Sequence, residues 1–585
     1  MSGHPPGELV AAAARPSIDL RRGAVFVAAF ALLAALWFGG LELRGLFAPD
    51  EGRYAEVPRE MLESGDWVTP RLNGIKYLEK PPLQYWATAA VFALFGEDEW
   101  TARLPTALAG LGGALVLAFA AARLGSRREG WLAGFILASS WGYFFAAQYI
   151  TLDMTLTLWF TCAMAAFLLA QRAGIDARAE RRWMLVAWAS MALAILTKGL
   201  IGIVLPGLAL AVYIVVARDA AVLRRLHPVP GLALFAAITV PWFALAQARN
   251  PEFFQFFFIH EHFARYALSG HDRGAPWWYF LPIMLVGTMP WTPLVVAALA
   301  RRGRAREEPL TSRIDVDRFL LVWAATVVVF FSLSSSKLPP YVLPALPALA
   351  LLTARRFPSW DETHAVGRAV VATALVAGLL AASLPFLSQW GKLARIVPML
   401  PAAVPWLCMA VLALAVGAIA SWLFARAGAM RTAVVALATA NIAFGQFVLI
   451  SAHVVDEGYS AERLTDLWLR GLLESGVASR RGRLVDGLRL NDDAPFYSVG
   501  SFDHSLPFYL GRTVTLVEHK NELAPGIAAD PTKYVASIAD FEREWREAPR
   551  AYAALRPDVF QRLSDDGLPM NVLARDTRRV IVARH

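Results

Sequence analysis

The chain carries little charge for its length and almost no cysteine. Only 18% of its 585 residues are charged and 57% are hydrophobic, whereas soluble proteins are about 25% charged. Because apolar runs of about 20 residues recur along the chain, this composition excludes a soluble enzyme, a disordered chain and a fibrous protein. The two cysteines, Cys162 and Cys408, lie inside apolar runs, so the sequence predicts neither a disulfide framework nor a thiol motif.

Nucleotide-binding signatures are also missing. The sequence has no Walker A loop and no dinucleotide fingerprint. A net charge of +9 would suggest a nucleic-acid partner in a soluble protein, but here the basic residues occupy short loops between apolar runs. We interpret them as topology signals and as contacts for anionic lipid headgroups, and we expect no nucleic-acid partner.

The apolar runs predict a polytopic α-helical membrane protein with about 13 transmembrane helices. Arginine clusters mark the cytoplasmic loops, and the spans alternate if the run 81–95 does not cross. That run is short for a span, begins with two prolines and contains Gln84, so we expect a helix at the membrane interface. The N-terminus is then inside and the C-terminus outside. The runs are 23–43, 81–95, 103–122, 129–147, 154–171, 183–197, 199–217, 229–247, 277–300, 318–335, 339–354, 365–387, 402–424 and 430–452.

This topology divides the chain into two domains. Residues 1–452 form the transmembrane domain, with a long first external loop at 44–102, and residues 453–585 form an external α/β domain. The segments 494–502 and 506–518 have the composition of strands. The segments 538–547 and 572–584 suggest a helix and a final strand.

Polar residues that suggest chemistry gather on one side of the membrane. All of them fall at external span ends or in external loops, although the topology was fixed by other residues, and charge near a membrane is costly. We therefore predict one external polar site. Its candidates are Asp50, Glu51, Arg53, Tyr54, Tyr77, Glu79, Lys80, Asp153, Lys198, His260, His262, Arg265, Lys337 and Tyr341.

Each candidate also has a structural interpretation. Asp50 follows a proline and suits a helix N-cap, but a carboxylate there also suits positioning of an acceptor or contact with a sugar amine. Lys80 either extends to lipid headgroups or holds a lipid phosphate. Asp153 stands alone between apolar residues, which favours a functional role. Lys198 lies in a tight turn, and Lys337 lies in a rigid, proline-bounded turn.

A metal site is a further hypothesis. His260 and His262 are two residues apart, so on a helix they point to nearly opposite sides and cannot share an ion. In an irregular loop they can bind zinc with Glu79 as a third ligand. Arg265 is close in sequence and is a suitable phosphate partner.

Several of these segments together resemble the aminoarabinose transferases of lipid A, membrane glycosyltransferases of the GT-C fold related to protein O-mannosyltransferases. The resemblance covers the whole chain. It is carried by PDEGRYAEV (49–57), EKPPLQYW (79–86), Leu152-Asp153, Thr197-Lys198-Gly199 and SSSKLPPY (334–341).

The resemblance implies an enzyme of the Gram-negative inner membrane with a periplasmic active site. It implies transfer of 4-amino-4-deoxy-L-arabinose from undecaprenyl phosphate to lipid A phosphates, with inversion, and resistance to polymyxin and other cationic peptides. By motif, Asp50 and Asp153 are the catalytic carboxylates. Lys80, Arg265 and Tyr341 surround the carrier phosphate. No cofactor is required, and we expect a monomer.

Two other functions are open at this point. A glycosyltransferase of the same fold acting on protein or another glycan has the same polar site. A secondary transporter places its polar residues near the membrane midplane, with related halves. The one-sided clustering and the absence of a visible repeat make transport the weaker hypothesis.

Overall fold

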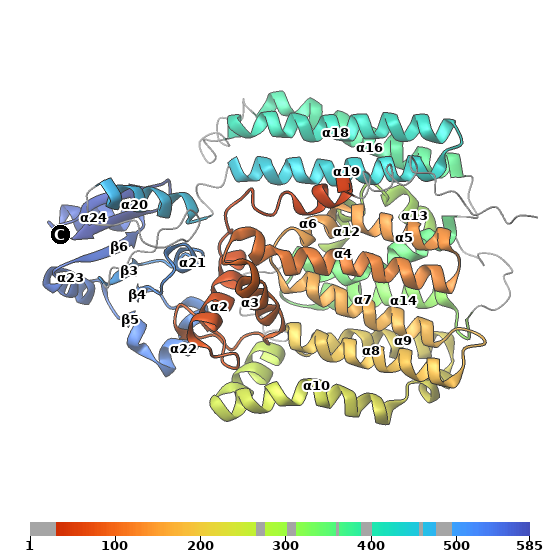
Figure 1. Cartoon of the computed structure of the whole chain (residues 1–585), viewed down its shortest axis with the longest axis horizontal. Helices are drawn as coiled ribbons and strands as arrows, with labels where there is room; N and C mark the ends of the chain where they lie inside the picture. Colours follow the sequence, from red (N-terminus) through yellow and green to blue (C-terminus); the bar gives the residue numbers. More distant parts are fainter. Residues whose placement is uncertain are drawn as a thin grey trace, which may run out of the picture.

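A helical bundle lies beside a smaller α/β domain, and helices α2 and α3 lie between them (Figure 1). The computed structural model describes residues 31–264, 275–300, 312–357, 362–387, 400–454, 460–474 and 494–584. The architecture agrees with the predicted polytopic α-helical protein that ends in an α/β domain.

The predicted apolar runs coincide with helices. Seven described helices are long and apolar enough to cross a membrane, or nine if each of two bent pairs counts as one span. Helix α9 is shorter, at 17 residues, and the first predicted run is helical from 31 to 38, where its description begins. The bundle helices are α4 (Glu99–Leu124), α5 (Arg127–Ser139), α6 (Trp141–Ala147), α7 (Leu152–Ala170), α8 (Ala177–Lys198), α9 (Ile201–Ala217), α10 (Pro228–Arg249), α12 (Phe280–Gly287), α13 (Thr292–Ala300), α14 (Val316–Leu333), α15 (Leu346–Arg356), α16 (Glu362–Leu387), α18 (Leu400–Arg426) and α19 (Met430–Val454).

Two spans are broken, and their breaks lie together. Helices α5 and α6 are bent by 67°, and α12 and α13 by 117°. The amide of Trp141 donates to the carbonyl of Met289 at 3.0 Å, and a Cβ added at Gly142 would lie 3.0 Å from the Cα of Gly287. Non-helical backbone is tolerated at membrane depth where protein buries it, and this close contact between the two breaks provides that burial.

The first external loop holds α2 (Asp50–Ser64), a hairpin of β1 (Arg71–Leu72) and β2 (Ile75–Lys76), and α3 (Leu83–Phe95). Helix α2 ends at Gly65, which adopts the left-handed conformation with φ of 68°. Helix α3 has 13 residues, about 20 Å at 1.5 Å per residue, which is too short to cross the hydrocarbon core. It lies at the end of the bundle next to α2 (Figure 1).

The C-terminal domain, residues 460–584, is built on a six-stranded sheet with the order β5-β4-β3-β6-β8-β7. Strands β3 to β6 run parallel, and β8 is antiparallel to both β6 and β7. Its elements are α20 (Glu462–Glu474), β3 (Phe496–Val499), α21 (Leu506–Leu510), β4 (Thr515–Val517), α22 (Ala524–Ala529), β5 (Tyr534–Val535), α23 (Ile538–Glu547), β6 (Ala551–Leu555), α24 (Pro557–Asp565), β7 (Asn571–Arg575) and β8 (Val580–Arg584).

Two predicted strands in this domain were wrong in part. The segment 506–518 forms a short helix before its strand, because Gly511 at φ 62° caps α21 and turns the chain. The segment 572–584 forms a hairpin of two strands, because the carboxylate of Asp576 accepts hydrogen bonds from the amides of Arg578 and Arg579 and closes a turn. The predicted helix at 538–547 is α23.

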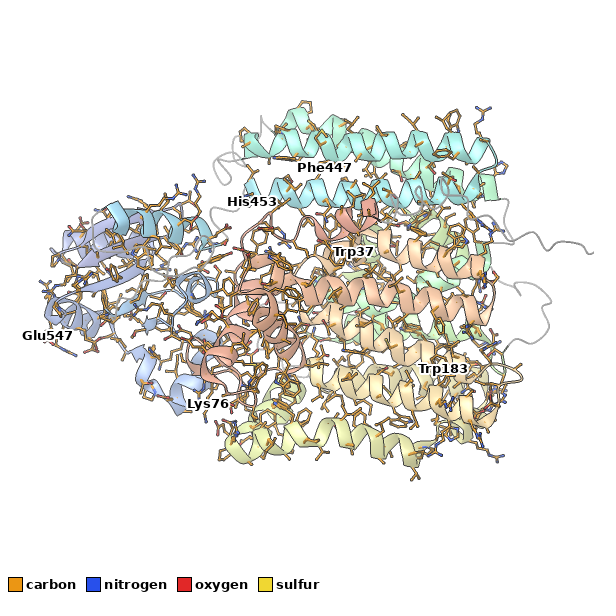
Figure 2. The ribbon with its side chains drawn as sticks, in the orientation of Figure 1. Trp37, Lys76, Trp183, Phe447, His453 and Glu547 are labelled. Carbon is orange, nitrogen blue, oxygen red and sulfur yellow. The ribbon has the colours of Figure 1, made fainter. Side chains whose placement is uncertain are left out.

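The C-terminal domain packs against the first external loop. Asn73 exchanges two hydrogen bonds with the backbone of Val514, at 2.8 and 2.7 Å. Gly52 approaches the backbone of Ser505 so closely that a Cβ would meet it at 2.4 Å. Figure 2 shows Lys76 where the first external loop meets the C-terminal domain, and Trp183 toward the opposite end of the bundle. These contacts fix the domain over one end of the bundle.

Candidate active site

Arg53 lies at the centre of a charge cluster where α2 meets the C-terminal domain. Its guanidinium lies 3.4 Å from Asp50 and donates to Glu522 at 2.8 Å. The other oxygen of Glu522 lies 2.8 Å from the ring of His504. Burial acts to raise the pKa of Glu522, but the His504 hydrogen bond and the Arg53 charge lower it to about 2. Glu522 is therefore ionised at neutral pH and holds Arg53 in place.

Asp50 is the accessible carboxylate of this cluster. It is the first residue of α2, its side chain is 39% exposed, and the N-cap position before it is occupied by Pro49. Within the described part of the chain, one oxygen faces Arg53 and the other accepts no hydrogen bond. The N-cap interpretation of Asp50 therefore fails, and a free carboxylate oxygen remains for a ligand.

Lys80 and Glu79 lie in the proline-bounded segment before α3. The ammonium of Lys80 donates to the carbonyl of Glu79 at 3.1 Å and lies 3.7 Å from its carboxylate. The hydroxyl of Tyr77 donates to the same carboxylate at 3.0 Å. Burial, together with the Glu79 charge, holds the pKa of Tyr77 well above its ordinary value, so this hydroxyl keeps its proton.

A cavity of about 500 Å³ opens between this segment, α22 and the chain after α10. We call it the external cavity. Its charged lining is mostly acidic, with one lysine that pairs with Glu252 at 3.1 Å. Tyr77 also borders it. The charged residues are Lys76, Glu79, Glu252 and Glu522.

Asp153, Lys198 and Tyr341 form a second cluster, contributed by α7, α8 and a 3₁₀ turn at Pro339–Ala345. Lys198 donates to Asp153 at 2.6 Å, and its ammonium lies 4.9 Å from the centre of the Tyr341 ring. These residues are far apart in sequence, yet the fold brings them together. Lys198 is therefore an ion-pair partner of Asp153.

Helix α3 lies between the two clusters. The side chain of Gln84 accepts a hydrogen bond from Thr155 at 2.6 Å, two residues from Asp153. The next residue, Tyr85, lies 6.0 Å from the ring of Tyr54 on α2. Its buried hydroxyl has no hydrogen-bond partner in the described part of the chain, which leaves a polar group available between the clusters.

Glu51 has a different environment from Asp50. It is fully buried, with Arg44 at 3.0 Å and Arg103 at 2.8 Å. It also accepts hydrogen bonds from the amides of Phe47 and Ile150. Burial acts to raise its pKa, but the two arginines lower it to about 2. Glu51 therefore joins the first span, α2 and α4, and its environment is structural.

The remaining predicted residues are only partly described. Lys337 is 9% exposed and donates to the carbonyl of Ser334 at 2.6 Å, closing its own turn. The backbone carrying His260 and His262 is a π-helix, Gln255–Ala264, but nothing is described of their side chains. Arg265 lies outside the described residues. Among the described residues no group of three metal ligands occurs, and the zinc site at Glu79, His260 and His262 stays a prediction.

The sequence did not predict that the C-terminal domain contributes side chains to the candidate site. Glu522 and His504 lie about 450 to 470 residues after Arg53 in the chain, in a segment without a motif. Arg103 was hidden inside an apolar run. The local sequence around each carries no signal for these pairings, because long-range ion pairs are set by the fold.

The chain matches two family models. Residues 486–584 match the aminoarabinose transferase C-terminal domain, and residues 24–257 match dolichyl-phosphate-mannose-protein mannosyltransferase. The chain is 36% identical over 393 residues to undecaprenyl phosphate-alpha-4-amino-4-deoxy-L-arabinose arabinosyl transferase 1 of Sodalis glossinidius, covering 63% of this chain and 68% of that protein. It is 35% identical over 316 residues to the corresponding protein of Aeromonas salmonicida, of which it spans little more than half, 56%.

The structure is similar to that of ArnT from Cupriavidus metallidurans bound to undecaprenyl phosphate, with a TM-score of 0.85. The identity is 35%, over 96% of this chain and 98% of the other. The chain belongs to the aminoarabinose transferase family. Membership of this family establishes the GT-C fold and a multi-pass membrane protein.

Proposed function

We propose that the protein transfers 4-amino-4-deoxy-L-arabinose from undecaprenyl phosphate to lipid A phosphates at the periplasmic face of the Gram-negative inner membrane. The observation that carries the proposal is the whole-chain likeness to ArnT bound to undecaprenyl phosphate. The free carboxylate oxygen of Asp50 supports the sugar assignment, because a carboxylate favours a protonated amine over a neutral hydroxyl.

The transfer is a single displacement at the anomeric carbon. A lipid A phosphate oxygen attacks that carbon, the bond to the carrier phosphate oxygen breaks, and undecaprenyl phosphate leaves with the bonding electrons. The configuration inverts. The nucleophile is already an anion, so little base catalysis is needed.

Named side chains have distinct tasks in this step. Lys80, with Arg265, stabilises the negative charge that develops on the departing phosphate. Asp50 orients the acceptor complex or stabilises positive charge on the sugar through its free oxygen. Asp153 supplies a second carboxylate, which pairs with Lys198, and the ammonium of Lys198 lies against the ring of Tyr341.

The test is mass spectrometry of lipid A from a polymyxin-sensitive strain that lacks its own transferase and supplies the donor lipid. Expression of this chain should add aminoarabinose to lipid A, and Asp50→Ala and Lys80→Ala should abolish the addition. Asp558→Ala is the matched control, because it removes a carboxylate that is 68% exposed on α24. Unmodified lipid A, with the protein present in the membrane, would remove the assignment of sugar and acceptor.

A second candidate is transfer of another polyprenyl-phosphate sugar to protein or glycan. It is favoured by the match of residues 24–257, which include Asp50 and Asp153, to the mannosyltransferase model. A hydroxyl acceptor needs a base, and Asp50 would then take its proton. Glycosylated protein in the same strain, with unmodified lipid A, would select this candidate.

A further inference from the structure

A cavity of about 570 Å³ lies between α13, α16 and α18. We call it the interhelical cavity. It lies where α16 begins and α18 ends, at the end of the bundle opposite the C-terminal domain (Figure 1). It therefore shares no residue with the candidate active site, and its chemistry is separate from glycosyl transfer.

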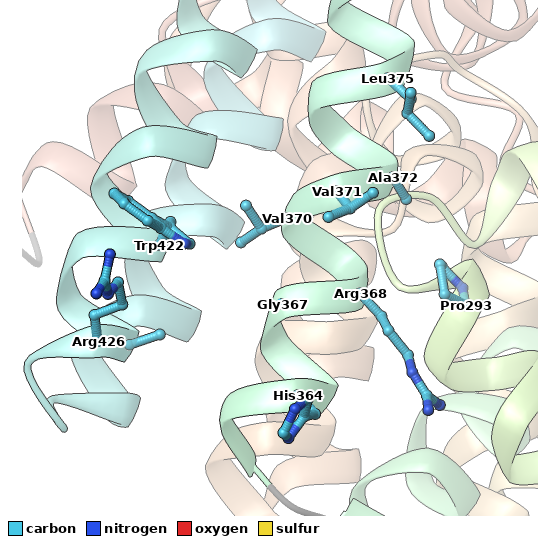
Figure 3. A pocket seen from close by; sticks show the side chains of 11 residues that line it. Pro293, His364, Gly367, Arg368, Val370, Val371, Ala372, Leu375, Trp422 and Arg426 are labelled. Atoms are coloured by element: carbon cyan, nitrogen blue, oxygen red, sulfur yellow. The ribbon is translucent and has the colours of Figure 1, made fainter.

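One face of α16 forms the floor of this cavity. His364, Gly367, Val371 and Leu375 follow one another along the helix, with Trp422 and Arg426 of α18 on one side and Pro293 on the other (Figure 3). Val371 and Leu375 are 57% and 63% exposed. Since α16 is long and apolar enough to span a membrane, these two side chains lie at the depth of lipid acyl chains.

Positive charge is concentrated at the end of the same cavity. Arg368 has no ion pair or hydrogen bond to the described part of the chain, and Arg426 stacks on the ring of Trp422 at 4.9 Å. The described lining contains no acidic residue. Two arginines at headgroup depth without a carboxylate favour an anionic ligand, and the Trp422 ring suits the interfacial position.

Gly367 lies on the face of α16 that lines the cavity. A Cβ added there meets no atom within 4 Å. Packing inside the protein therefore does not require a glycine at position 367. The glycine leaves room on the outer face of α16, where a helix-interior glycine otherwise costs about 1 kcal/mol.

We propose that the interhelical cavity binds an anionic phospholipid of the leaflet opposite the C-terminal domain. The lipid headgroup lies over the start of α16, with Arg368 on the side of α13 and Arg426 on the side of α18, and an acyl chain follows Val371 and Leu375. A free phosphate ion would use the arginines but leave the apolar wall unexplained, so the combination of charge and apolar surface selects a lipid.

Native mass spectrometry of the full chain tests the proposal. The detergent-purified protein is titrated with phosphatidylglycerol and, separately, with phosphatidylcholine of the same acyl chains. Phosphatidylglycerol should bind more tightly. The double variant Arg368→Gln/Arg426→Gln should weaken its binding by about tenfold or more, since each arginine near a phosphate contributes about a factor of five. The matched control is Arg224→Gln, an exposed arginine of the 3₁₀ turn at Ala220–Arg225.

A second variant fills the cavity without removing charge. Gly367→Leu improves helix propensity and meets open space, so the protein should fold as the wild type by size-exclusion chromatography. It should lose the bound phosphatidylglycerol. Equal binding of the two lipids to the wild type, or undiminished phosphatidylglycerol binding by the double variant or by Gly367→Leu, would overturn the proposal.

Discussion

The guanidinium of Arg53, in the first external loop, donates a hydrogen bond to the carboxylate of Glu522, in the C-terminal domain, at 2.8 Å. The same guanidinium lies 3.4 Å from Asp50. The C-terminal domain therefore touches the residue that positions the accessible carboxylate of the site. We therefore expect changes in the C-terminal domain at Glu522 to alter the rate of transfer.

Glu522→Gln should lower lipid A modification by about tenfold, since a hydrogen bond to a charged group contributes about 1.5–3 kcal/mol. The amide keeps the shape but removes the charge that holds Arg53. The measurement is the initial rate of aminoarabinose transfer in membranes containing equal amounts of each protein. Asp558→Asn, on the far helix α24, is the control. A rate equal to wild type would show that Arg53 needs no support from the C-terminal domain.

The stability contributed by the Arg53–Glu522 ion pair should depend on pH. The pKa of Glu522 falls from 4.5 to about 2 on folding, so its contribution to stability is full above pH 4.5 and is lost as the pH falls toward 2. Thermal unfolding of wild type and Glu522→Gln in detergent should therefore differ at neutral pH and converge in strong acid. A difference that stays constant down to the acid limit would contradict the ion pair.

Neutralising Glu51 should impair folding, whereas neutralising the adjacent Asp50 should impair transfer. Glu51→Gln leaves two buried arginines without their counter-charge, so we expect a loss of about 3–5 kcal/mol and little folded protein. Asp50→Asn changes an accessible side chain and should fold normally but lose transfer. Fluorescence-detected size-exclusion chromatography and lipid A analysis separate the two results. Normal folding of Glu51→Gln would refute its structural role.

The Asp153–Lys198 pair should show coupling in a double-mutant cycle. The side chains of Asp153 and Lys198 are mostly buried, at 9% and 18% exposed. Removing either one therefore leaves the other as a buried charge without its partner. Asp153→Asn and Lys198→Met should each lower the unfolding temperature. The double variant should recover part of the loss, with a coupling energy of about 1–3 kcal/mol. Strict additivity would mean that the two side chains do not interact.

The sequence predicted the helices and the one-sided site because hydropathy and arginine placement are local signals. It gathered Asp50, Lys80 and Asp153 into one predicted site, but it did not pair Lys198 with Asp153, since the two residues are 45 positions apart. It also treated Leu506–Leu510 as strand, where Gly511 ends a short helix. The partners of Arg53 depend on how the C-terminal domain lies on the first loop, and no local pattern encodes that placement.

The contacts of Asn73 with Val514 and of Arg53 with Glu522 join segments made at opposite ends of synthesis. Because chains are synthesised from the N-terminus, the first loop is made before the domain that it contacts exists. The order of translation thus delays completion of the site until the last strands have folded.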